Sequence, residues 1–438
     1  MMNHELLLQI IGEWLHDTKL PSPVPRESPV ISVESLSTIL AIVGPRRAGK
    51  TFFLLQLIRN LLDSGHANQE EVLFVDFEDY RLKGFAPVDM DGLLTGFQQL
   101  TGHEPRFLFF DEVQHLPEWS RVLRTLHNRR RYRMVIAGSN SSLLSSEIAT
   151  ELRGRYEDAL LLPFSFREFL RFQNLPYDKA LLHTAQRGRI MAAFDDYLRF
   201  GGFPETFLRD SVAEKRKLLQ NYYTTIFYKD ILERYNIKAR TVLDQMMMAL
   251  LNGASELFSI STFEKQLKAA SLSGSKRTIA NYLHFLEEAF FLITNEKFSY
   301  SVRKRMMNPL KVYLMDTGFG LLSGAFSENR GKWLENMVAI ELYRQQKRMF
   351  YFKENQECDF VVQEGGRPAE AWQVCWEITS KNEKREFRGL LEAMGTLKLR
   401  RGGILTHNQE AIRSFDGKTI RLIPVWKWLL LGPEGQKV

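Results

Sequence analysis

The stretch GPRRAGKT, from Gly44 to Thr51, contains residues that are suited to binding nucleotide phosphates. It fits the pattern G-x-x-x-x-G-K-[ST], whose glycines let backbone N–H groups approach phosphate oxygens at a helix N-terminus. In this pattern Lys50 reaches the β- and γ-phosphates, and the Thr51 hydroxyl contacts Mg²⁺. The alternative, a glycine-containing turn before an ordinary helix, is less consistent with the flanking sequence. An apolar strand pattern (38–43) precedes the stretch and a helical pattern (50–62) follows it, as the phosphate-binding motif requires. The predicted cofactors are ATP and Mg²⁺, and the predicted phosphate-binding residues are Gly44, Pro45, Arg46, Arg47, Ala48, Gly49, Lys50, Thr51 and Phe52.

An acidic pair, Asp111 and Glu112, follows another apolar strand pattern in FLFFDE. A carboxylate at the end of such a strand holds Mg²⁺ directly or through water, so Thr51 and Asp111 are the predicted metal ligands. Glu112 is placed to polarise the attacking water, which predicts hydrolysis rather than transfer to a second substrate. The pair alone would be consistent with a solvated strand end, but together with GPRRAGKT it predicts an ATPase.

Two more strand patterns end in polar residues. The stretch MVIAG leads into Ser139 and Asn140, and in P-loop ATPases a polar residue at this point contacts the γ-phosphate or the water. Asn140 is therefore a candidate catalytic residue. The stretch VLFV ends at Asp76, which Glu78 and Asp79 follow, and we expect these acids to cap or solvate the sheet edge. Strands that alternate with helices predict a parallel sheet with its site at the carboxyl ends of the strands.

These motifs together resemble those of the prokaryotic AAA-type ATPases related to the archaeal ATPase group. The resemblance rests on GPRRAGKT, FLFFDEVQHLPEW, MVIAGSN, LRGRYEDALLLPFSFREFL and FGGFPE, and on the later stretches KVYLMDTGF, WLENMVAIEL, ECDFVV and QVC. It covers most of the chain, from about Leu36 to Trp376. It implies a P-loop domain that binds and hydrolyses ATP, followed by a C-terminal domain of unknown function.

Arg153 and Arg155 precede an apolar strand pattern (159–163), where AAA-type ATPases present an arginine finger. Such a finger completes the site of a neighbouring subunit, so this interpretation implies a homo-oligomer. The alternative is that both arginines pair with carboxylates on a solvated surface.

A second set of chemically suited residues lies near the C-terminus. Glu335 lies on a helical pattern (332–346), and Asp359 begins the second of three strand patterns (349–352, 359–362 and 372–378). This order matches the core of restriction-endonuclease-like nucleases. Their sites combine two or three carboxylates for a divalent cation with a lysine.

Gln373 and Cys375 stand where a nuclease site needs an acid and a lysine. Neither supplies the missing charge, although Lys353 on the neighbouring hairpin or Lys381 beyond the strand would be able to bring an ammonium group. We therefore expect a nuclease-like fold without nuclease chemistry, in which Cys375 is a core residue. An ATP-dependent nuclease remains an alternative.

Residues 261–298 contain two helical patterns joined by a Ser-Gly turn, and a hairpin-like basic stretch (301–305) follows them. This arrangement predicts a winged helix-turn-helix. Its second helix would expose Lys276, Arg277, Asn281 and His284, which are suited to phosphates and base edges. Winged helices also dock proteins, so DNA and a protein remain alternative partners.

The composition is that of an ordinary globular protein, with 438 residues of which 44% are hydrophobic and 25% are charged. There are 59 Lys and Arg against 52 Asp and Glu, an excess that is compatible with nucleic acid without establishing it. The two cysteines, Cys358 and Cys375, exclude a disulfide framework and a Cys-rich zinc site. No apolar run approaches the roughly 18 residues of a membrane helix. The start of the chain is typical of an amphipathic helix rather than a signal peptide. We expect a cytoplasmic protein that does not bind membranes.

The predicted fold class is α/β, with an AAA-type P-loop domain, a helical lid, a winged helix and a restriction-endonuclease-like domain. The corresponding boundaries are 1–34 for an N-terminal helix and linker, 35–164 for the ATPase core, 165–253 for the lid, 254–330 for the winged helix and 331–438 for the C-terminal domain. The predicted function is ATP hydrolysis coupled to DNA binding. The alternative is a nucleotide-gated switch that binds a protein.

Overall fold

The computed structural model describes residues 2–18, 20–21, 24–27, 32–138, 152, 154–178, 180, 184–323, 330–415 and 418–432. The chain forms two compact units, Met1–Pro163 and Phe164–Val438. Each unit has its own sheet and its own buried core.

The first unit is built on a five-stranded parallel sheet with the strand order β2-β3-β4-β1-β5. Its strands are β1 (Ile39–Val43), β2 (Val72–Asp76), β3 (Phe107–Asp111), β4 (Arg133–Gly138) and β5 (Tyr156–Leu160). Both β1 and β3 are buried at every position, as expected for a parallel sheet that helices cover on both faces. The chain runs from β1 to β2 at one edge of the sheet and then returns through β3 and β4 to β5 on the other side of β1, so its winding direction reverses. Ligand sites form at such points in open α/β sheets.

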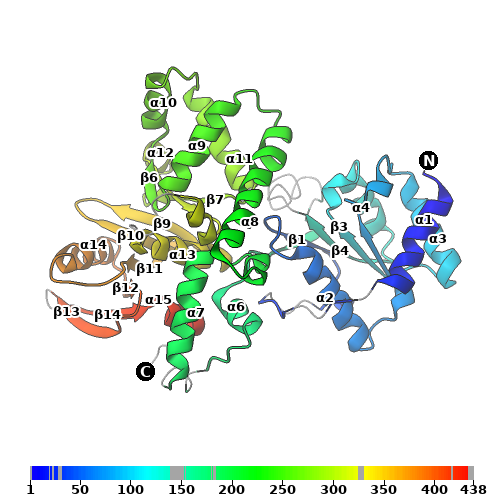
Figure 1. The fold of residues 1–438 in the computed structure, drawn as a ribbon, viewed down its shortest axis with the longest axis horizontal. Coiled ribbons are helices and arrows are strands. Elements are labelled where there is room, and N and C mark those ends of the chain that lie inside the picture. The colour runs from blue at the N-terminus through cyan, green and yellow to red at the C-terminus, as the bar shows by residue number, and fades with distance from the viewer. Residues whose placement is uncertain are drawn as a thin grey trace. The chain divides into compact units, whose positions relative to one another are not determined.

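The helices described beside this sheet are α1 (His4–Gly12), α2 (Lys50–Asp63), α3 (Asp89–Thr101) and α4 (Trp119–Asn128). Figure 1 shows α1 lying beside α3. The apolar side of α2, including Leu54 and Ile58, packs into the core with Trp14. The Trp14 indole N–H donates to the carbonyl of Val72 at 2.5 Å, which attaches the segment after α1 to the start of β2.

The second unit contains a nine-stranded mixed sheet with the order β13-β14-β12-β11-β10-β9-β7-β8-β6. Its strands are β6 (Glu256–Phe258), β7 (Leu292–Lys297), β8 (Leu310–Leu314), β9 (Arg348–Lys353), β10 (Glu357–Glu364), β11 (Arg367–Val374), β12 (Arg401–Thr406), β13 (Ala411–Phe415) and β14 (Lys418–Pro424). The strands β6, β7 and β8 pair antiparallel among themselves, and β7 pairs parallel with β9. One continuous sheet therefore joins them to the C-terminal strands.

The described helices of the second unit are α6 (Phe166–Phe172), α7 (Gln186–Phe200), α8 (Val212–Thr225), α9 (Arg240–Asn252), α10 (Ile260–Ala269), α11 (Lys276–Glu288), α12 (Val302–Met307), α13 (Arg330–Arg344), α14 (Glu383–Thr396) and α15 (Val425–Leu431). In Figure 1, α9, α10 and α11 lie near the β6 end of the sheet, and β13 and β14 form its other end. The α/β fold class, with a parallel sheet, a helical region and a C-terminal mixed sheet, is confirmed.

Three predicted elements differ from the structure. The hairpin-like stretch at 301–305 is the helix α12, because the Ser301 side chain accepts from the N–H of Lys304 and caps the helix. The strand predicted at 159–163 is β5, which runs from Tyr156 to Leu160. It is an edge strand with exposed acids, so the search for an apolar run missed its first half.

The third strand of the C-terminal group ends at Val374 rather than at residue 378. Trp376, two residues beyond, stacks on His407 with ring centroids 3.9 Å apart, and its carbonyl accepts from the His407 N–H at 3.1 Å. Cys375 is buried in the core of the second unit.

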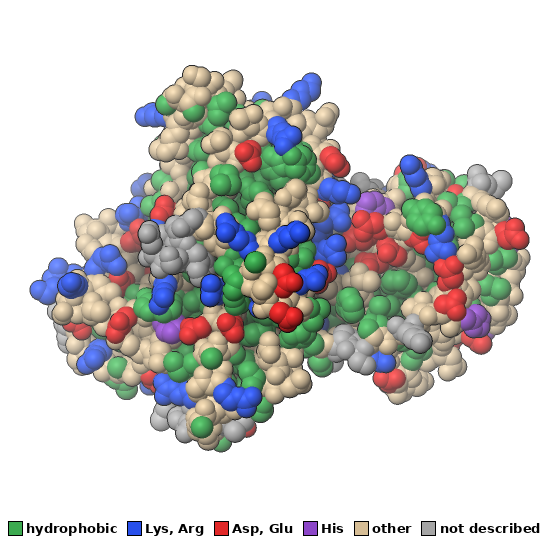
Figure 2. Space-filling model, viewed as in Figure 1, with side chains coloured by type: hydrophobic (Ala, Val, Ile, Leu, Met, Phe, Trp, Pro, Cys, Tyr) green, Lys and Arg blue, Asp and Glu red, His purple; other side chains and the backbone are tan. Residues whose placement is uncertain are grey.

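On the face shown in Figure 2, Lys and Arg side chains are spread among acidic and apolar ones rather than gathered in one basic area. Among the helices in the described part of the chain, none is long and apolar enough to span a bilayer.

Candidate nucleotide site

The loop between β1 and α2 has a backbone that its glycines make possible. A Cβ atom on Gly44 would lie 1.9 Å from the carbonyl oxygen of Leu161, so only glycine fits there. Gly49 has a φ of +93° and Arg47 a φ of 65°, both in the left-handed region. The chain thus curls tightly before α2 begins at Lys50. Backbone N–H groups at the start of a helix are suited to phosphate oxygens.

Lys50 points back over this loop. Its Nζ donates to the carbonyl oxygens of Gly44 at 3.1 Å and Pro45 at 3.0 Å, and the residue is buried. Phosphate oxygens are stronger partners for an ammonium group than neutral carbonyls. The contacts therefore hold Lys50 where it would meet a phosphate bound in the loop.

The two predicted metal ligands lie in direct contact. The Thr51 hydroxyl donates to Asp111 Oδ2 at 2.5 Å, although the residues are 60 positions apart. Burial raises the pKa of Asp111 to about 6, with further contributions from Glu112 and Asp76 that the Thr51 hydrogen bond opposes. A hydroxyl beside a buried carboxylate fits Mg²⁺, which prefers oxygen ligands.

Glu112 follows directly after β3 ends. Its φ of 44° is in the left-handed region, which is uncommon for glutamate and turns the chain out of the strand. Its backbone N–H donates to Asp111 Oδ1 at 3.0 Å, and its carboxylate accepts from the side chain of Gln114. Glu112, the second acid of FLFFDE, is thus held at the same edge of the sheet as Asp111.

The sequence interpretation missed the position of Asp76. This residue ends β2 and pairs in register with Asp111 at the end of β3. It is half-buried, and burial raises its pKa together with the charges of Glu78, Glu112 and Asp79. The signal was present, because VLFVD ends in an acid as FLFFD does. Its register with the neighbouring strand, however, depends on the sheet order.

The remaining loop residues show how the loop is supported. Arg26 donates from Nη1 to the carbonyl of Ala48 at 2.8 Å and from Nη2 to that of Leu162 at 2.5 Å, so it attaches the segment before β1 to the loop. Arg46 lies 3.7 Å from Glu78. Phe52 is exposed on the first turn of α2.

The remaining predicted catalytic residues are Asn140, Arg153 and Arg155. Asn140 and Arg153 lie outside the described residues. Arg155 directly precedes β5, and its carbonyl accepts from the N–H of Ile39 at 2.8 Å. Ile39 begins β1, so the backbone of Arg155 lies at the amino edge of the sheet. Gly44 follows the other end of β1. It is five residues after Ile39 and therefore roughly 16 Å from it at the usual rise per residue of a strand.

Comparison with known proteins gives matches over most of the chain. Residues 36–170 match a family described as "AAA domain", and residues 191–328 match a "Domain of unknown function (DUF8612)". The "Uncharacterized protein MJ1544" of Methanocaldococcus jannaschii is 34% identical over 403 residues, which cover 90% of this chain and 88% of that protein. An "Uncharacterized protein" of Haemophilus influenzae is 26% identical over 359 residues, which cover 82% of this chain and 87% of that protein.

Among solved structures, the Walker-type ATPase PABY2304 of Pyrococcus abyssi matches with 14% identity and a TM-score of 0.41. The match covers 73% of this chain and 95% of that one. The ORC1 protein of Aeropyrum pernix, solved in complex with DNA, matches with 12% identity and a TM-score of 0.27 over 78% of this chain and 93% of that one.

Proposed function

Because the chain belongs to a family of P-loop AAA-type ATPases that carry a further domain of unknown function, we propose that it binds ATP with Mg²⁺ and hydrolyses it. The observation that carries the proposal is the contact between Thr51 and Asp111, which brings two oxygen ligands together beneath the glycine-rich loop. Bound Mg²⁺ supplies charge neutralisation at the phosphates. Thr51 and Asp111 would hold it.

Each residue of the site has its own role in the proposed mechanism, and its position determines that role. The backbone between Gly44 and Thr51 wraps the phosphates, and Lys50 exchanges its two carbonyl partners for phosphate oxygens. Glu112, held beside Asp111, accepts a proton from the attacking water. Its turned backbone supports this role, because strained conformations of this kind cluster at functional sites.

An arginine from a second subunit completes the proposed site. The backbone of Arg155 lies at the amino edge of the sheet, at the opposite end of β1 from the loop. In this proposal Arg155, and Arg153 beside it, therefore act on the site of a neighbouring copy in a homo-oligomer. An arginine finger stabilises charge that develops in the transition state.

The proposed DNA contact lies in the second unit. The order β6, α10, α11, β7, α12, β8 supports a winged helix, with β8 between β7 and β6. In this arrangement α11 is the recognition helix, and its exposed side chains are Lys276, Arg277, Asn281 and His284. The proposed parts of the chain keep the predicted boundaries, with the ATPase core at 35–164, the lid at 165–253, the winged helix at 254–330 and the C-terminal domain at 331–438.

One observation favours a protein partner instead. Tyr300, Val302, Met306 and Met307 are exposed large apolar residues in and beside the short helix α12. Apolar side chains gathered on a surface favour a protein interface. The nucleotide-gated switch that binds a protein is therefore the second candidate function.

The role of Glu112 separates hydrolysis from a switch that only binds nucleotide. Glu112→Gln should still bind ATP but lower turnover by at least about 100-fold, the usual contribution of a general base. Lys50→Ala, which removes the ammonium group, should weaken ATP binding as well as lower turnover. Full turnover by Glu112→Gln would contradict the proposed mechanism.

A further inference from the structure

A polar cavity of 570 Å³ lies in the second unit, and Glu335, Asp359 and Gln373 are among the residues that line it. These residues are on α13, β10 and β11, the elements for which the sequence predicts a nuclease-like fold without nuclease chemistry. The cavity also contains a lysine that the sequence interpretation did not consider. Lys311 enters from β8, whereas Lys353 lies at the cavity wall paired with Glu357.

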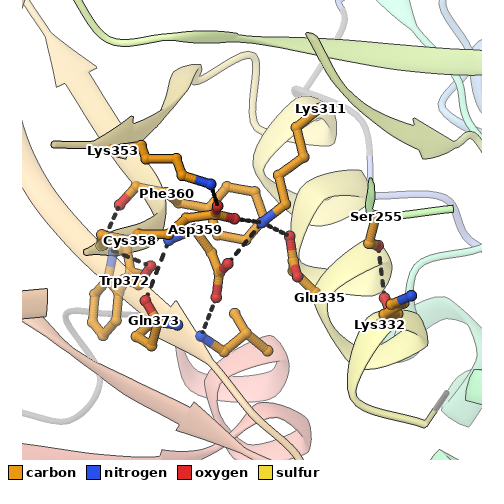
Figure 3. A network of polar contacts seen from close by, with 12 residues as sticks. Ser255, Lys311, Lys332, Glu335, Lys353, Cys358, Asp359, Phe360, Trp372 and Gln373 are labelled. Carbon is orange, nitrogen blue, oxygen red and sulfur yellow. Dashed lines mark hydrogen bonds and ion pairs between the residues drawn. The ribbon is translucent and has the colours of Figure 1, made fainter. Parts of the chain in front are cut away.

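Lys311 is surrounded by carboxylates. Its Nζ lies 2.8 Å from Glu335 Oε1, 2.9 Å from Glu357 Oε1 and 2.8 Å from Asp359 Oδ1. Figure 3 shows the ammonium group of the lysine between the carboxylates of Glu335 and Asp359. An ammonium group has three protons to donate, so these three contacts use its full capacity. The side chain is 4% exposed.

The acids around Lys311 have their other partners within the protein. Asp359 Oδ2 accepts from the N–H of Val374 at 2.9 Å, and Glu335 Oε1 accepts from the Tyr313 hydroxyl at 2.7 Å. Gln373 donates from Nε2 to Glu386 Oε2 at 2.7 Å. The amide in the place of a nuclease acid is thus already bonded to a neighbouring acid.

We propose that Lys311 takes the place of a divalent cation in this cavity, so that the C-terminal sheet holds its carboxylates together without a metal. A divalent cation would need the same carboxylate oxygens, at distances of roughly 2.0 to 2.6 Å. It would have to displace the ammonium group, because two cations sharing these ligands repel each other. The inference is independent of ATP hydrolysis and excludes metal-dependent cleavage at this site.

The charge state of Lys311 supports this assignment. Burial alone would lower the pKa of Lys311, but Asp359 and Glu335 hold it well above its ordinary value, so the lysine stays charged.

The position of Lys311 also has a consequence for assembly of the second unit. Lys311 is on β8, which pairs with β6 and β7, whereas Asp359 is on β10 in the C-terminal part of the same sheet. A metal ion would bind the carboxylates whatever the position of β8. A lysine from β8 makes the cavity depend on that strand.

The test is Mn²⁺ binding to the full chain, without nucleotide, by electron paramagnetic resonance. All variants carry Asp111→Asn, which removes the expected carboxylate ligand for a metal ion in the first unit. With Lys311 present, this protein and its Glu335→Gln derivative should bind Mn²⁺ equally weakly. Adding Lys311→Ala should create one site at least tenfold tighter, and adding Glu335→Gln to that variant should abolish the new site.

Two results would overturn the proposal. One is a Mn²⁺ site in the Lys311-containing protein that Glu335→Gln removes, since the lysine would then lie beside a metal rather than replace it. This comparison leaves Lys311 in place, so it holds even where Lys311→Ala fails to fold. The other is a Lys311→Ala variant that keeps its circular dichroism spectrum but gains no Mn²⁺ site. Glu335→Gln is a mild control, because the amide keeps the shape of the carboxyl group and can still accept from the Tyr313 hydroxyl.

Discussion

Asp76 and Asp111 lie directly opposite each other where β2 and β3 end, so two carboxylates share the carboxyl edge of the first sheet. Burial and neighbouring acids raise the pKa of Asp111 to about 6, and they also raise the pKa of Asp76. An acid whose pKa is raised by folding binds its proton more tightly in the native than in the unfolded state. Stability is therefore lost as the pH rises from the unfolded to the folded pKa.

Asp111→Asn should accordingly stabilise the nucleotide-free protein at pH 8. The gain is at most about 3 kcal/mol, since each pKa unit corresponds to roughly 1.4 kcal/mol. It should shrink to roughly 1 kcal/mol at pH 4.5, where the native carboxyl keeps its proton and the unfolded one is still mostly ionised, and it vanishes only below the unfolded pKa. Urea unfolding at the two pH values measures the difference, and the same variant should lose ATP turnover.

Asp63→Asn is the matched control, because Asp63 is exposed at the end of α2. Its effect should be small and the same at both pH values. A stabilisation by Asp111→Asn that does not change with pH would contradict the assigned cause.

Gly44→Ala should disrupt the nucleotide site through sterics alone. The added Cβ would lie 1.9 Å from the carbonyl oxygen of Leu161, so the loop or the end of β5 must move. We expect a loss of a few kcal/mol in stability, together with loss of ATP binding by calorimetry. Gly12→Ala, on α1 with nothing within 4 Å of its Cβ position, should be neutral or stabilise by up to about 1 kcal/mol. Equal behaviour of the two variants would refute the packing argument.

Arg155 should act between subunits. Arg155→Ala should bind ATP normally and lose turnover, whereas Lys50→Ala should lose its own site but keep the arginine. Mixing the two inactive proteins should restore part of the activity, since an intact loop can then meet an intact arginine. Mixtures that stay inactive while co-purifying as one complex would exclude the intersubunit role. Preparations of each variant alone provide the baseline.

DNA binding should depend on the amino-terminal end of α11. Lys276→Ala with Arg277→Ala should weaken duplex binding and reduce the slope of log K against log salt concentration by about 2, because two phosphates are no longer neutralised by the protein. Lys265→Ala, also exposed but on α10, should leave the slope unchanged. Fluorescence anisotropy over a salt series measures both. An unchanged slope in the double variant would favour the protein-binding alternative.

Local motifs were readable from the sequence because their geometry is local. GPRRAGKT predicted the loop and the start of α2, and FLFFD predicted a buried strand that ends at Asp111. The contact between Thr51 and Asp111 followed from combining two such motifs. Even the wrongly predicted stretch at 301–305 held a readable signal, since serine is a preferred helix cap.

Contacts between residues far apart in the sequence could not be predicted from the sequence. Asp76 reaches the nucleotide edge only because β2 lies next to β3 in register, which no periodicity reveals. Lys311 meets Asp359 across 48 residues of sequence, and a search confined to the neighbouring strands looked at Lys353 and Lys381 instead. The order of the strands in the sheet determines which charged residues from distant strands come into contact. That order depends on the packing of the whole unit.

The central claim is that the glycine-rich loop and the acidic edge hydrolyse ATP. Steady-state ATP hydrolysis by the purified protein, with Mg²⁺ and with Lys50→Ala as the blank, tests it most directly. We predict turnover that Lys50→Ala removes and that duplex DNA stimulates. Turnover that DNA does not alter would shift the coupling to a protein partner. Hydrolysis no faster in the unaltered protein than in Lys50→Ala would contradict the account.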